Sequence, residues 1–315
     1  MTTSATTLQA TSDFYASNPA TRVLRLAMGA SQRLWPALGL RLAYRLFGTP
    51  LPPRWLRHDR PWPGTWTQER WAFEQASLTL HRPTPAQGTP AEGACVLLVH
   101  GWGGHAGQML PLAQALMAQG LRPVLLDLPA HGKSAGRVSN LPQFARAMEY
   151  TLARLAQQGQ AVPGVVAHSL AANALAFAAA RGLPTQRVVL LAPPASPREY
   201  TRLFAQVFGL HEPMRAALQR RIEAREGIVM TQFEPHASGP RISQPTLVVH
   251  DRGDRINRFA DGTAFAESIA GARLLATDGL GHTRLLRDAQ VAQAVADFLA
   301  EEDPTLESPT NHKVL

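Results

Sequence analysis

The sequence of 315 residues contains a single cysteine, Cys95, which excludes an intramolecular disulfide and leaves no zinc site built from cysteines. Its first fifteen residues lack the basic and apolar regions of a secretory signal, so we expect a cytoplasmic protein. Residues 93–121 and 155–180 contain no Asp, Glu, Lys or Arg. Gly, Pro, Gln and His interrupt both stretches, which favours buried strand–turn–helix segments over membrane-spanning helices.

Charge is also scarce outside one segment. Between Ala20 and Arg60 eight arginines stand against one acid, Asp59, and they account for nearly all of the formal net charge of +8. The rest of the chain is close to neutral, whereas a surface that follows a phosphate backbone needs its own basic stripe. We therefore predict no nucleic-acid partner. The hydrophobic content of 45% is sufficient for a sizeable core.

Apolar runs alternate with helical patterns over most of the chain. The runs typical of buried strands are ACVLLVH, PVLLDL, GVVAH, RVVLLAPP and PTLVVHD. Strands that alternate with helices predict a mostly parallel central sheet with helices on both faces. A segment of helical patterns after RVVLLAPP interrupts the alternation, and an insertion there overhangs the carboxyl ends of the strands. We predict that it forms a small helical cap after the fourth of these strands.

These patterns divide the chain into five parts. The predicted parts are a disordered N-terminus (1–18), a basic helical arm with a Pro/Trp-rich linker (19–75), an α/β core (76–195 and 242–300), a helical cap insertion (196–241) and a disordered tail (301–315).

The N-terminal helical arm allows two interpretations. Arg41 and Arg45 share one narrow sector of a helix that is otherwise apolar. Packing of the apolar face on the body of the protein is the favoured interpretation. The alternative is peripheral contact with an anionic membrane through residues 20–48.

Short motifs follow the predicted strands in a fixed order. They are HGWGG (100–104), DLPAHGKSAG (127–136), AHSLA (167–171), HDRGDRI (250–256) and GLGH (279–282). Together they resemble the α/β-hydrolase fold family, over about Ser77 to Ala300. The resemblance implies an α/β-hydrolase fold, with HGWGG as the oxyanion loop and AHSLA as the nucleophile elbow. HDRGDRI corresponds to the family's acid loop and GLGH to its histidine loop.

The resemblance also implies a role for each residue. Ser169 is the expected nucleophile, His282 the base that takes its proton, and Asp254 the acid that orients the imidazole. The backbone N–H groups of Trp102 and Leu170 are the expected oxyanion hole. Asp251 is the alternative acid, but it occupies the usual glycine position of the motif.

The elbow departs from the G-x-S-x-G pattern, because Ala167 and Ala171 replace both glycines. Alanine adds one methyl group at each place, which a tight strand–helix junction can accommodate. We therefore expect Ser169 at positive φ. The alternative is a serine that only caps the following helix.

Other residues are candidates for contacts around the site. We predict substrate binding by His168 and by three cap residues, Phe204, Phe208 and Met214, for which packing in the core of the cap is the alternative. His105 and His211 are further candidates for positions near the site. The remaining motif histidines, His100, His131 and His250, are expected to make structural hydrogen bonds. No spacing predicts a metal site or a cofactor.

A serine at the elbow excludes the family's dehalogenases and epoxide hydrolases, which use an aspartate. The predicted function is hydrolysis of a carboxylic ester or thioester with a small-molecule, largely apolar acyl group, through an acyl-enzyme. Acyl transfer and carbon–carbon bond hydrolysis are the alternative reactions. A non-catalytic or membrane-associated binding module on the same fold is the alternative from another class.

Overall fold

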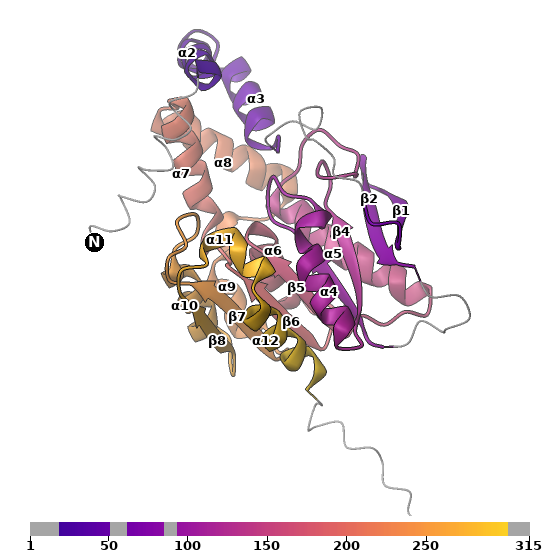
Figure 1. The fold of residues 1–315 in the computed structure, drawn as a ribbon. Helices are drawn as coiled ribbons and strands as arrows, with labels where there is room; N and C mark the ends of the chain where they lie inside the picture. The colour runs from indigo at the N-terminus through magenta and orange to yellow at the C-terminus, as the bar shows by residue number, and fades with distance from the viewer. Residues whose placement is uncertain (1–18, 51–61, 85–92, 302–315) are drawn as a thin grey trace, which may run out of the picture.

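The centre of the molecule is a sheet of eight strands in the order β1-β2-β4-β3-β5-β6-β7-β8 (Figure 1). The computed structural model describes residues 19–50, 62–84 and 93–301. The predicted disordered N-terminus (1–18), all of the predicted disordered tail (301–315) except Glu301, and most of the linker lie outside the described residues. The strands are β1 (Trp66–Phe73), β2 (Ala76–Pro83), β3 (Cys95–Val99), β4 (Arg122–Asp127), β5 (Gly164–His168), β6 (Arg187–Leu191), β7 (Thr246–Asp251) and β8 (Arg273–Thr277). β1 and β2 pair antiparallel, and all pairs from β4 to β8 are parallel.

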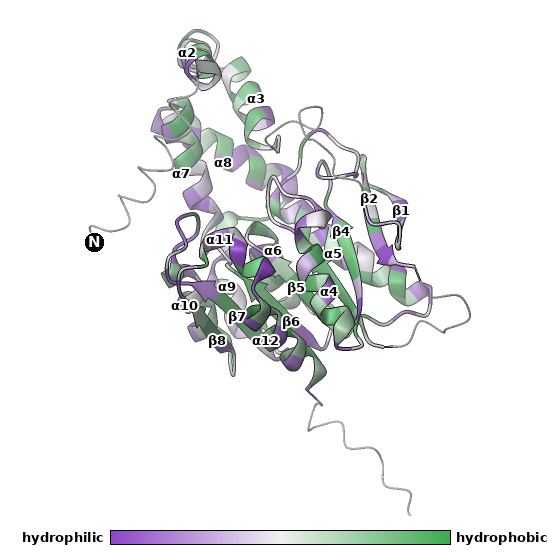
Figure 2. Cartoon of the chain, in the orientation of Figure 1, coloured by the Kyte–Doolittle hydropathy of each residue, from purple (hydrophilic) through white to green (hydrophobic). Residues whose placement is uncertain are grey.

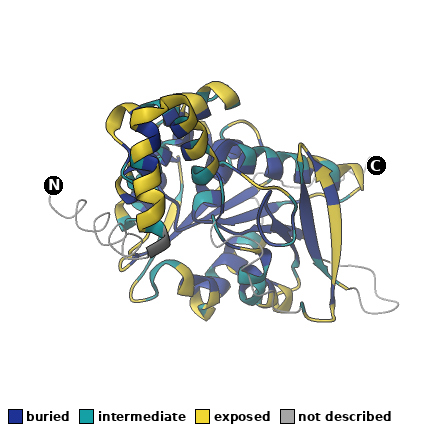
Figure 3. Ribbon diagram, turned by 90° about the horizontal axis from the view of Figure 1, so that it is seen from above, coloured by how far each residue is buried: buried dark blue, intermediate teal, exposed yellow. Residues whose placement is uncertain are grey.

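The parallel strands are apolar on both sides because helices cover both faces of the sheet. Alternate side chains of β3 enter different clusters: Leu97 packs in one core and Leu98 in the other. The first core is closed by α5 (Leu141–Gln157), α6 (Leu170–Ala179) and α10 (Phe259–Ser268). The second is closed by α4 (Leu110–Ala118) and α12 (Ala289–Ala300), which leaves the central strands fully buried (Figure 3). The predicted mostly parallel sheet with helices on both faces is confirmed.

The outermost strand of the antiparallel edge, β1, was not predicted from the sequence. β1 lies inside the range 19–75 that was predicted to be arm and linker, and this assignment is wrong for residues 66–73. The middle of the strand, residues 67–70, is polar and exposed, whereas Trp71 and Phe73 pack into the first core. A strand with one face in water lacks the continuous apolar run that identified the other strands.

The cap consists of helices inserted between β6 and β7. They are α7 (Pro197–Phe208), α8 (Glu212–Glu226), η3 (Met230–Phe233), α9 (Pro235–Ser238) and η4 (Gly239–Arg241). Ser196 accepts a hydrogen bond from Arg198 N–H at the start of α7, and Gly209 ends that helix at a φ of 68°. His211 accepts from Met214 N–H and so caps α8, which is a structural position rather than the predicted one near the site.

The arm consists of α2 (Pro19–Leu34) and α3 (Pro36–Phe47), which pack against each other and against the cap. α2 contacts α7 and α3 contacts α8, so the cap separates the arm from the sheet (Figure 1). Met28 and Ala43 of the arm are buried in one cluster with Phe204 and Phe208 of the cap. One face of the arm therefore packs on protein, as the favoured interpretation predicts, and the protein it meets is the cap.

Asp127, at the end of β4, is a buried hub that joins several segments. Its carboxylate accepts from Ala106 N–H at 2.6 Å and from Lys133 N–H at 2.9 Å, and it lies 2.9 Å from His81 Nε2. Burial works to raise the pKa of Asp127, but the hydrogen bond from His81, the imidazoles nearby and the Lys133 amide outweigh it and lower this pKa. The DLPAHGKS turn is thereby fixed to β2 and to the segment that precedes α4.

The same turn requires glycine at position 132. Gly132 has a φ of +46°, and a Cβ placed there would lie 2.0 Å from Asp127 Oδ1. We expect Gly132→Ala to destabilise the fold by about 3 kcal/mol or more. The alanine is strained at this positive φ, and its methyl group also displaces the buried Asp127 carboxylate.

Gly120→Ala is the matched control, since Gly120 has a φ of +78° and no atom within 4 Å of its added Cβ. This variant should lose only the cost of strain, about 1 kcal/mol. Urea denaturation of both variants measures the difference in unfolding free energy. Equal losses of stability would show that the Asp127 carboxylate moves aside at no cost.

Candidate active site

Ser169 stands at the junction between β5 and α6 with a φ of 57° and a ψ of −127°. The predicted positive φ is confirmed. Its side chain makes no capping hydrogen bond to α6, so the alternative of a simple helix cap is not what the structure contains. Ser169 N–H donates to Leu191 O at 2.8 Å, which fixes the turn to the end of β6. The Ser169 hydroxyl therefore lies at the edge of the sheet and takes no part in capping α6.

Three side chains form a continuous line of hydrogen bonds at this edge. His282 Nε2 lies 3.0 Å from Ser169 Oγ, and His282 Nδ1 lies 2.7 Å from Asp254 Oδ2. Asp254 follows β7, and His282 lies in α11 (Gly281–Arg284), which follows β8. With Nδ1 protonated and donating to the carboxylate, Nε2 is free to accept the serine proton. The structure thus brings together the three residues that the motifs single out.

Asp254 is buried and held from several sides. Its Oδ1 accepts from Ile256 N–H at 2.7 Å and from Asn257 N–H at 3.0 Å, while His250 Nε2 lies 3.4 Å from Oδ2. Burial works to raise the pKa of Asp254, but the hydrogen bonds from His250 and His282 outweigh it and hold this pKa well below its usual range. The carboxylate is therefore charged beside the His282 ring.

Asp251, the alternative acid, contacts different groups. Its carboxylate accepts from Thr277 Oγ1 at 2.8 Å, from Leu280 N–H at 2.9 Å and from Gly253 N–H at 2.9 Å. These bonds hold the end of β8 and the loop that leads to His282. Asp251 thus positions the histidine loop, and Asp254 contacts the imidazole itself.

The HGWGG loop lies directly against Ser169. A Cβ placed on Gly101 would be 2.8 Å from Ser169 Cβ, so only glycine allows this approach. Within the described part of the chain, the backbone N–H groups of Trp102 and Leu170 donate to no protein acceptor. The assignment of these two N–H groups to an oxyanion hole stays a prediction.

Asn257 is a member of this site that sequence reasoning missed. Its Nδ2 donates to Ala192 O at 2.8 Å and lies 3.4 Å from Ser169 Oγ. Its Oδ1 accepts from the hydroxyl of Tyr200 at 2.7 Å. Tyr200 belongs to α7. Burial is the main cause that raises the pKa of its phenol, and the carboxylates of Asp261 and Asp254 raise it further. The cap is thereby connected through Asn257 to Ser169.

Only the position of Asn257 in the chain could have indicated this role. It stands three residues after Asp254 in the same loop, and its backbone N–H donates to that carboxylate. No sequence pattern connects it to Tyr200, because the two residues are 57 positions apart.

His168 is placed for support rather than for the predicted substrate binding. The residue is 4% exposed, and its Nε2 lies 2.9 Å from the backbone carbonyl of His282, to which it donates. The pKa of His168 is lowered to about 3, mainly because the residue is buried and secondly because of the charge of His282. A neutral imidazole therefore braces the loop that contains the candidate base.

The three cap residues predicted to bind substrate lie against the arm instead. Phe204, Phe208 and Met214 are each less than 10% exposed, in the cluster that the arm completes, and the ring of Phe47 packs edge-on against Phe204. The prediction that they contact substrate is therefore replaced by its alternative, packing in the core of the cap. The physical reason is that the arm supplies a second apolar surface which the cap sequence alone does not reveal.

The motif histidines make the structural hydrogen bonds that the sequence predicts. His100 Nδ1 donates to Gly101 O at 2.7 Å, and its Nε2 accepts from Leu128 N–H at 3.2 Å. His131 Nδ1 donates to Pro129 O at 2.8 Å, and His250 Nε2 donates to Asn257 O at 3.2 Å. His105 is exposed at the start of η2 (Ala106–Met109).

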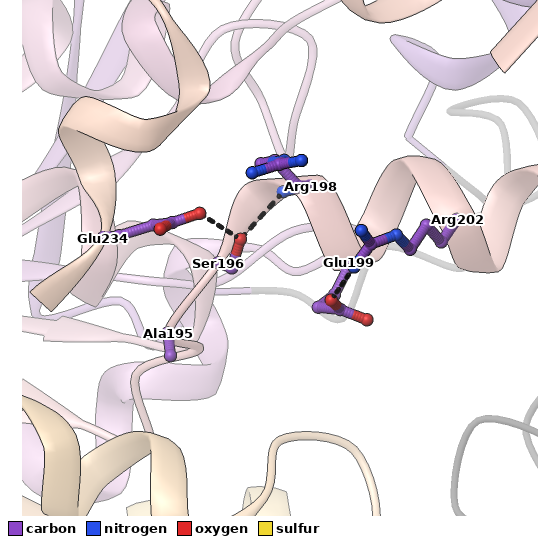
Figure 4. Close-up of a pocket in the computed structure, with 6 residues that line it drawn as sticks. All are labelled: Ala195, Ser196, Arg198, Glu199, Arg202 and Glu234. Carbon is purple, nitrogen blue, oxygen red and sulfur yellow. Dashed lines mark hydrogen bonds and ion pairs between the residues drawn. The ribbon is translucent and has the colours of Figure 1, made fainter. Parts of the chain in front are cut away.

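A charged pocket lies at the base of the cap (Figure 4). Ser196 donates to Glu234 at 2.8 Å on one side of it, and Glu199 pairs with Arg202 on the other. None of its lining residues belongs to the hydrogen-bonded line at Ser169. No group of three or more His, Cys, Asp or Glu side chains suited to a metal ion occurs within residues 19–50, 62–84 and 93–301.

Comparison with known proteins identifies the family and the fold. Residues 90–233 match the family described as serine aminopeptidase, S33, and residues 228–309 match the family described as TAP-like protein. None of the curated proteins matches the chain. Together with its fold and motifs, these matches show that the chain is a member of the α/β-hydrolase fold family.

Solved structures show the same fold at low sequence identity. Est1E from Butyrivibrio proteoclasticus with bound ferulic acid is 18% identical, with a TM-score of 0.61 over 73% of this chain and 97% of its own. The Pyrococcus furiosus esterase Pf2001 is 17% identical, with a TM-score of 0.60 over 80% and 97%. The thioesterase domain from the curacin biosynthetic pathway is 18% identical, with a TM-score of 0.50 over 74% and 99%.

The buried His168 predicts a pH dependence of stability. Its pKa in the folded protein is about 3 against an ordinary value of 6.5, so between these values the unfolded chain binds a proton that the folded chain does not. Stability is then lost as the pH falls below 6.5. His168→Gln retains a donor toward His282 O and removes the titration.

We expect the unfolding free energy of the wild type, relative to His168→Gln, to fall by up to about 1.4 kcal/mol per pH unit below 6.5. Urea denaturation at pH 7.5, 6 and 5 measures it. A difference that stays constant with pH would contradict the assignment.

Proposed function

We propose that the protein is a serine hydrolase that cleaves a carboxylic ester or thioester through an acyl-enzyme on Ser169. The observation that supports it most directly is the line of hydrogen bonds from Ser169 through His282 to Asp254. A serine hydroxyl is a weak nucleophile until a base takes its proton, and His282 Nε2 lies within reach to do so. The charged Asp254 stabilises the imidazolium that results.

The first half-reaction forms the acyl-enzyme. Ser169 Oγ attacks the acyl carbon while its proton passes to His282 Nε2, and the carbonyl oxygen becomes an oxyanion. The backbone N–H groups of Trp102 and Leu170 stabilise that charge. His282 then gives the proton to the leaving alcohol or thiol, and the bond between the acyl carbon and the leaving group breaks.

The second half-reaction releases the acid. A water molecule loses a proton to His282 Nε2 and attacks the acyl carbon, and the proton returns to Ser169 Oγ as the ester bond to the enzyme breaks. Esters and thioesters both fit this sequence, in keeping with the esterases and the thioesterase domain that share the fold. An alcohol in place of water would make the reaction an acyl transfer.

The acyl group must be bound by residues other than the cap phenylalanines, because Phe204 and Phe208 are buried against the arm. Short and medium acyl chains are therefore the proposed substrates. Trp102 and Leu170, which are half-buried at the two predicted oxyanion positions, are the apolar side chains that we propose to contact them.

Labelling by a fluorophosphonate tests the nucleophile. We expect the wild type to be labelled at Ser169 and to hydrolyse p-nitrophenyl esters, and Ser169→Ala to lose both properties. Ser196→Ala is the control, because the Ser196 hydroxyl is half-buried and hydrogen-bonded to a carboxylate, Glu234, but has no imidazole beside it. The control should be labelled as the wild type is. Equal labelling of wild type and Ser169→Ala would refute the proposal.

Replacing the acid tests the role of the imidazole tautomer. Asp254→Asn keeps the shape but presents the wrong group to His282 Nδ1, so we expect kcat for ester hydrolysis to fall by about 10⁴-fold. Asp278→Asn, an exposed acid in the same loop as His282, should retain wild-type kcat. A loss below tenfold in Asp254→Asn would assign orientation of the imidazole to another group.

A further inference from the structure

Hydrogen bonds fix the arm to the cap in addition to the apolar cluster that the two share. Gln32 Nε2 donates to Gly209 O at 2.8 Å, and Gln32 Oε1 accepts from His211 N–H at 3.1 Å. A Cβ on Gly39 would lie 3.1 Å from the Gln32 backbone, so α2 and α3 meet at close range. The inward side of α2 consists of Met28, Ser31 and Gln32, all of them buried. The arm is thereby fixed to the cap in one orientation.

The arm exposes large apolar side chains beside its arginines, and Figure 2 shows hydrophobic and hydrophilic residues mixed along α2 and α3. Val23, Leu26 and Leu34 follow a helical spacing on the side of α2 opposite its buried residues, and they are 66%, 76% and 65% exposed. Trp35, at the turn into α3, is 62% exposed. A shallow groove at this turn is lined by Leu34, Trp35, Pro36, Ala37, Leu38 and Arg41.

This exposure is concentrated rather than scattered. Of the twelve large hydrophobic side chains that are exposed in the described residues, seven belong to the arm: Val23, Leu24, Leu26, Leu34, Trp35, Leu38 and Leu42. Isolated exposed apolar residues are common on soluble proteins, whereas a concentration of them on one element is typical of an interaction surface. α2 therefore exposes Val23, Leu26 and Leu34 together with its arginines, while Ser31 and Gln32 lie on its buried side.

The charge of the same surface limits what can cover it. Residues 19–50 contain no Asp or Glu. They contain five arginines, which lie in α2 and α3 and are all exposed. A second copy joined through this face would bring the two sets of arginines together, because a two-fold interface places the same patch on both sides. An anionic lipid surface satisfies both properties, since it attracts the arginines and accepts apolar side chains and tryptophan at its boundary.

We propose that the arm is a membrane-docking surface that lies in the interface of an anionic phospholipid bilayer. Val23, Leu26, Leu34 and Trp35 enter the acyl boundary, and the arginines contact lipid phosphates. In the described ranges no helix has the length and apolar character of a membrane span, so the arm lies on the bilayer rather than through it. This surface is separate from Ser169 and does not depend on the proposed function.

Vesicle binding of the full-length protein tests the proposal. Removal of the arm is unsuitable, because it would expose Phe204, Phe208 and Met214. We expect binding to phosphatidylcholine vesicles with 30% phosphatidylserine to exceed binding to phosphatidylcholine alone by tenfold or more. Raising the salt to 0.5 M should weaken it, because exposed charges are screened.

Two double variants separate the apolar and electrostatic contributions. Leu26→Gln with Leu34→Gln, and Arg22→Gln with Arg33→Gln, should each weaken binding to the anionic vesicles by about tenfold or more. The matched control is Met117→Gln with Val229→Gln, which removes exposed apolar side chains outside the arm and should bind as the wild type does.

Three outcomes would overturn the proposal. The first is equal binding to both kinds of vesicle, and the second is wild-type binding by the two arm variants. The third is that the protein binds no vesicles but forms dimers at higher concentration, which the Leu26→Gln with Leu34→Gln variant no longer forms. Hydrolysis of a soluble p-nitrophenyl ester by the arm variants should remain at the wild-type rate. Loss of vesicle binding with retained hydrolysis, or the reverse, therefore distinguishes failure of this proposal from failure of the proposed function.

Discussion

Parallel pairing of β5 with β6, β6 with β7 and β7 with β8 brings the carboxyl ends of four strands to one edge of the sheet. Ser169, Asp254 and His282 depend on that register. Ser169 follows β5, Asp254 follows β7, and His282 follows β8, although 113 positions separate the serine from the histidine. A slip of one residue in any of these strands would turn its side chains to the opposite face and separate the three groups.

The loops that leave this edge support one another through backbone contacts. Asp251 holds the loop before His282 by its N–H groups, and His168 holds His282 by its carbonyl. Asn257 connects Ser169 to Ala192 and, through Tyr200, to the cap. The candidate nucleophile and base are therefore fixed by residues whose own positions are determined by hydrogen bonds, which is the preorganisation that catalysis by positioned groups needs.

The sequence was sufficient for the parts of the fold that follow from local patterns. The buried strands, the helices between them and the cap insertion were predicted because apolar runs and helical spacing mark them directly. Ser169, Asp254 and His282 could be selected because each follows a strand within a motif. β1 was missed because one of its faces is polar, and Asn257 and Tyr200 because their contact is tertiary. Phe204, Phe208 and Met214 of the cap were wrongly predicted to contact substrate. Their partner is the arm, and no local pattern indicates which surface an apolar side chain will meet.

The backbone of Ser169 has a consequence for the evolution of this chain. A non-glycine residue at a φ of 57° and a ψ of −127° occupies a region that stores about 1–3 kcal/mol of strain. Glycine would relax the turn without disturbing β5 or α6, so selection for stability alone would replace this serine. A serine at this position costs the chain part of a small margin of stability, which is consistent with the role proposed for its hydroxyl.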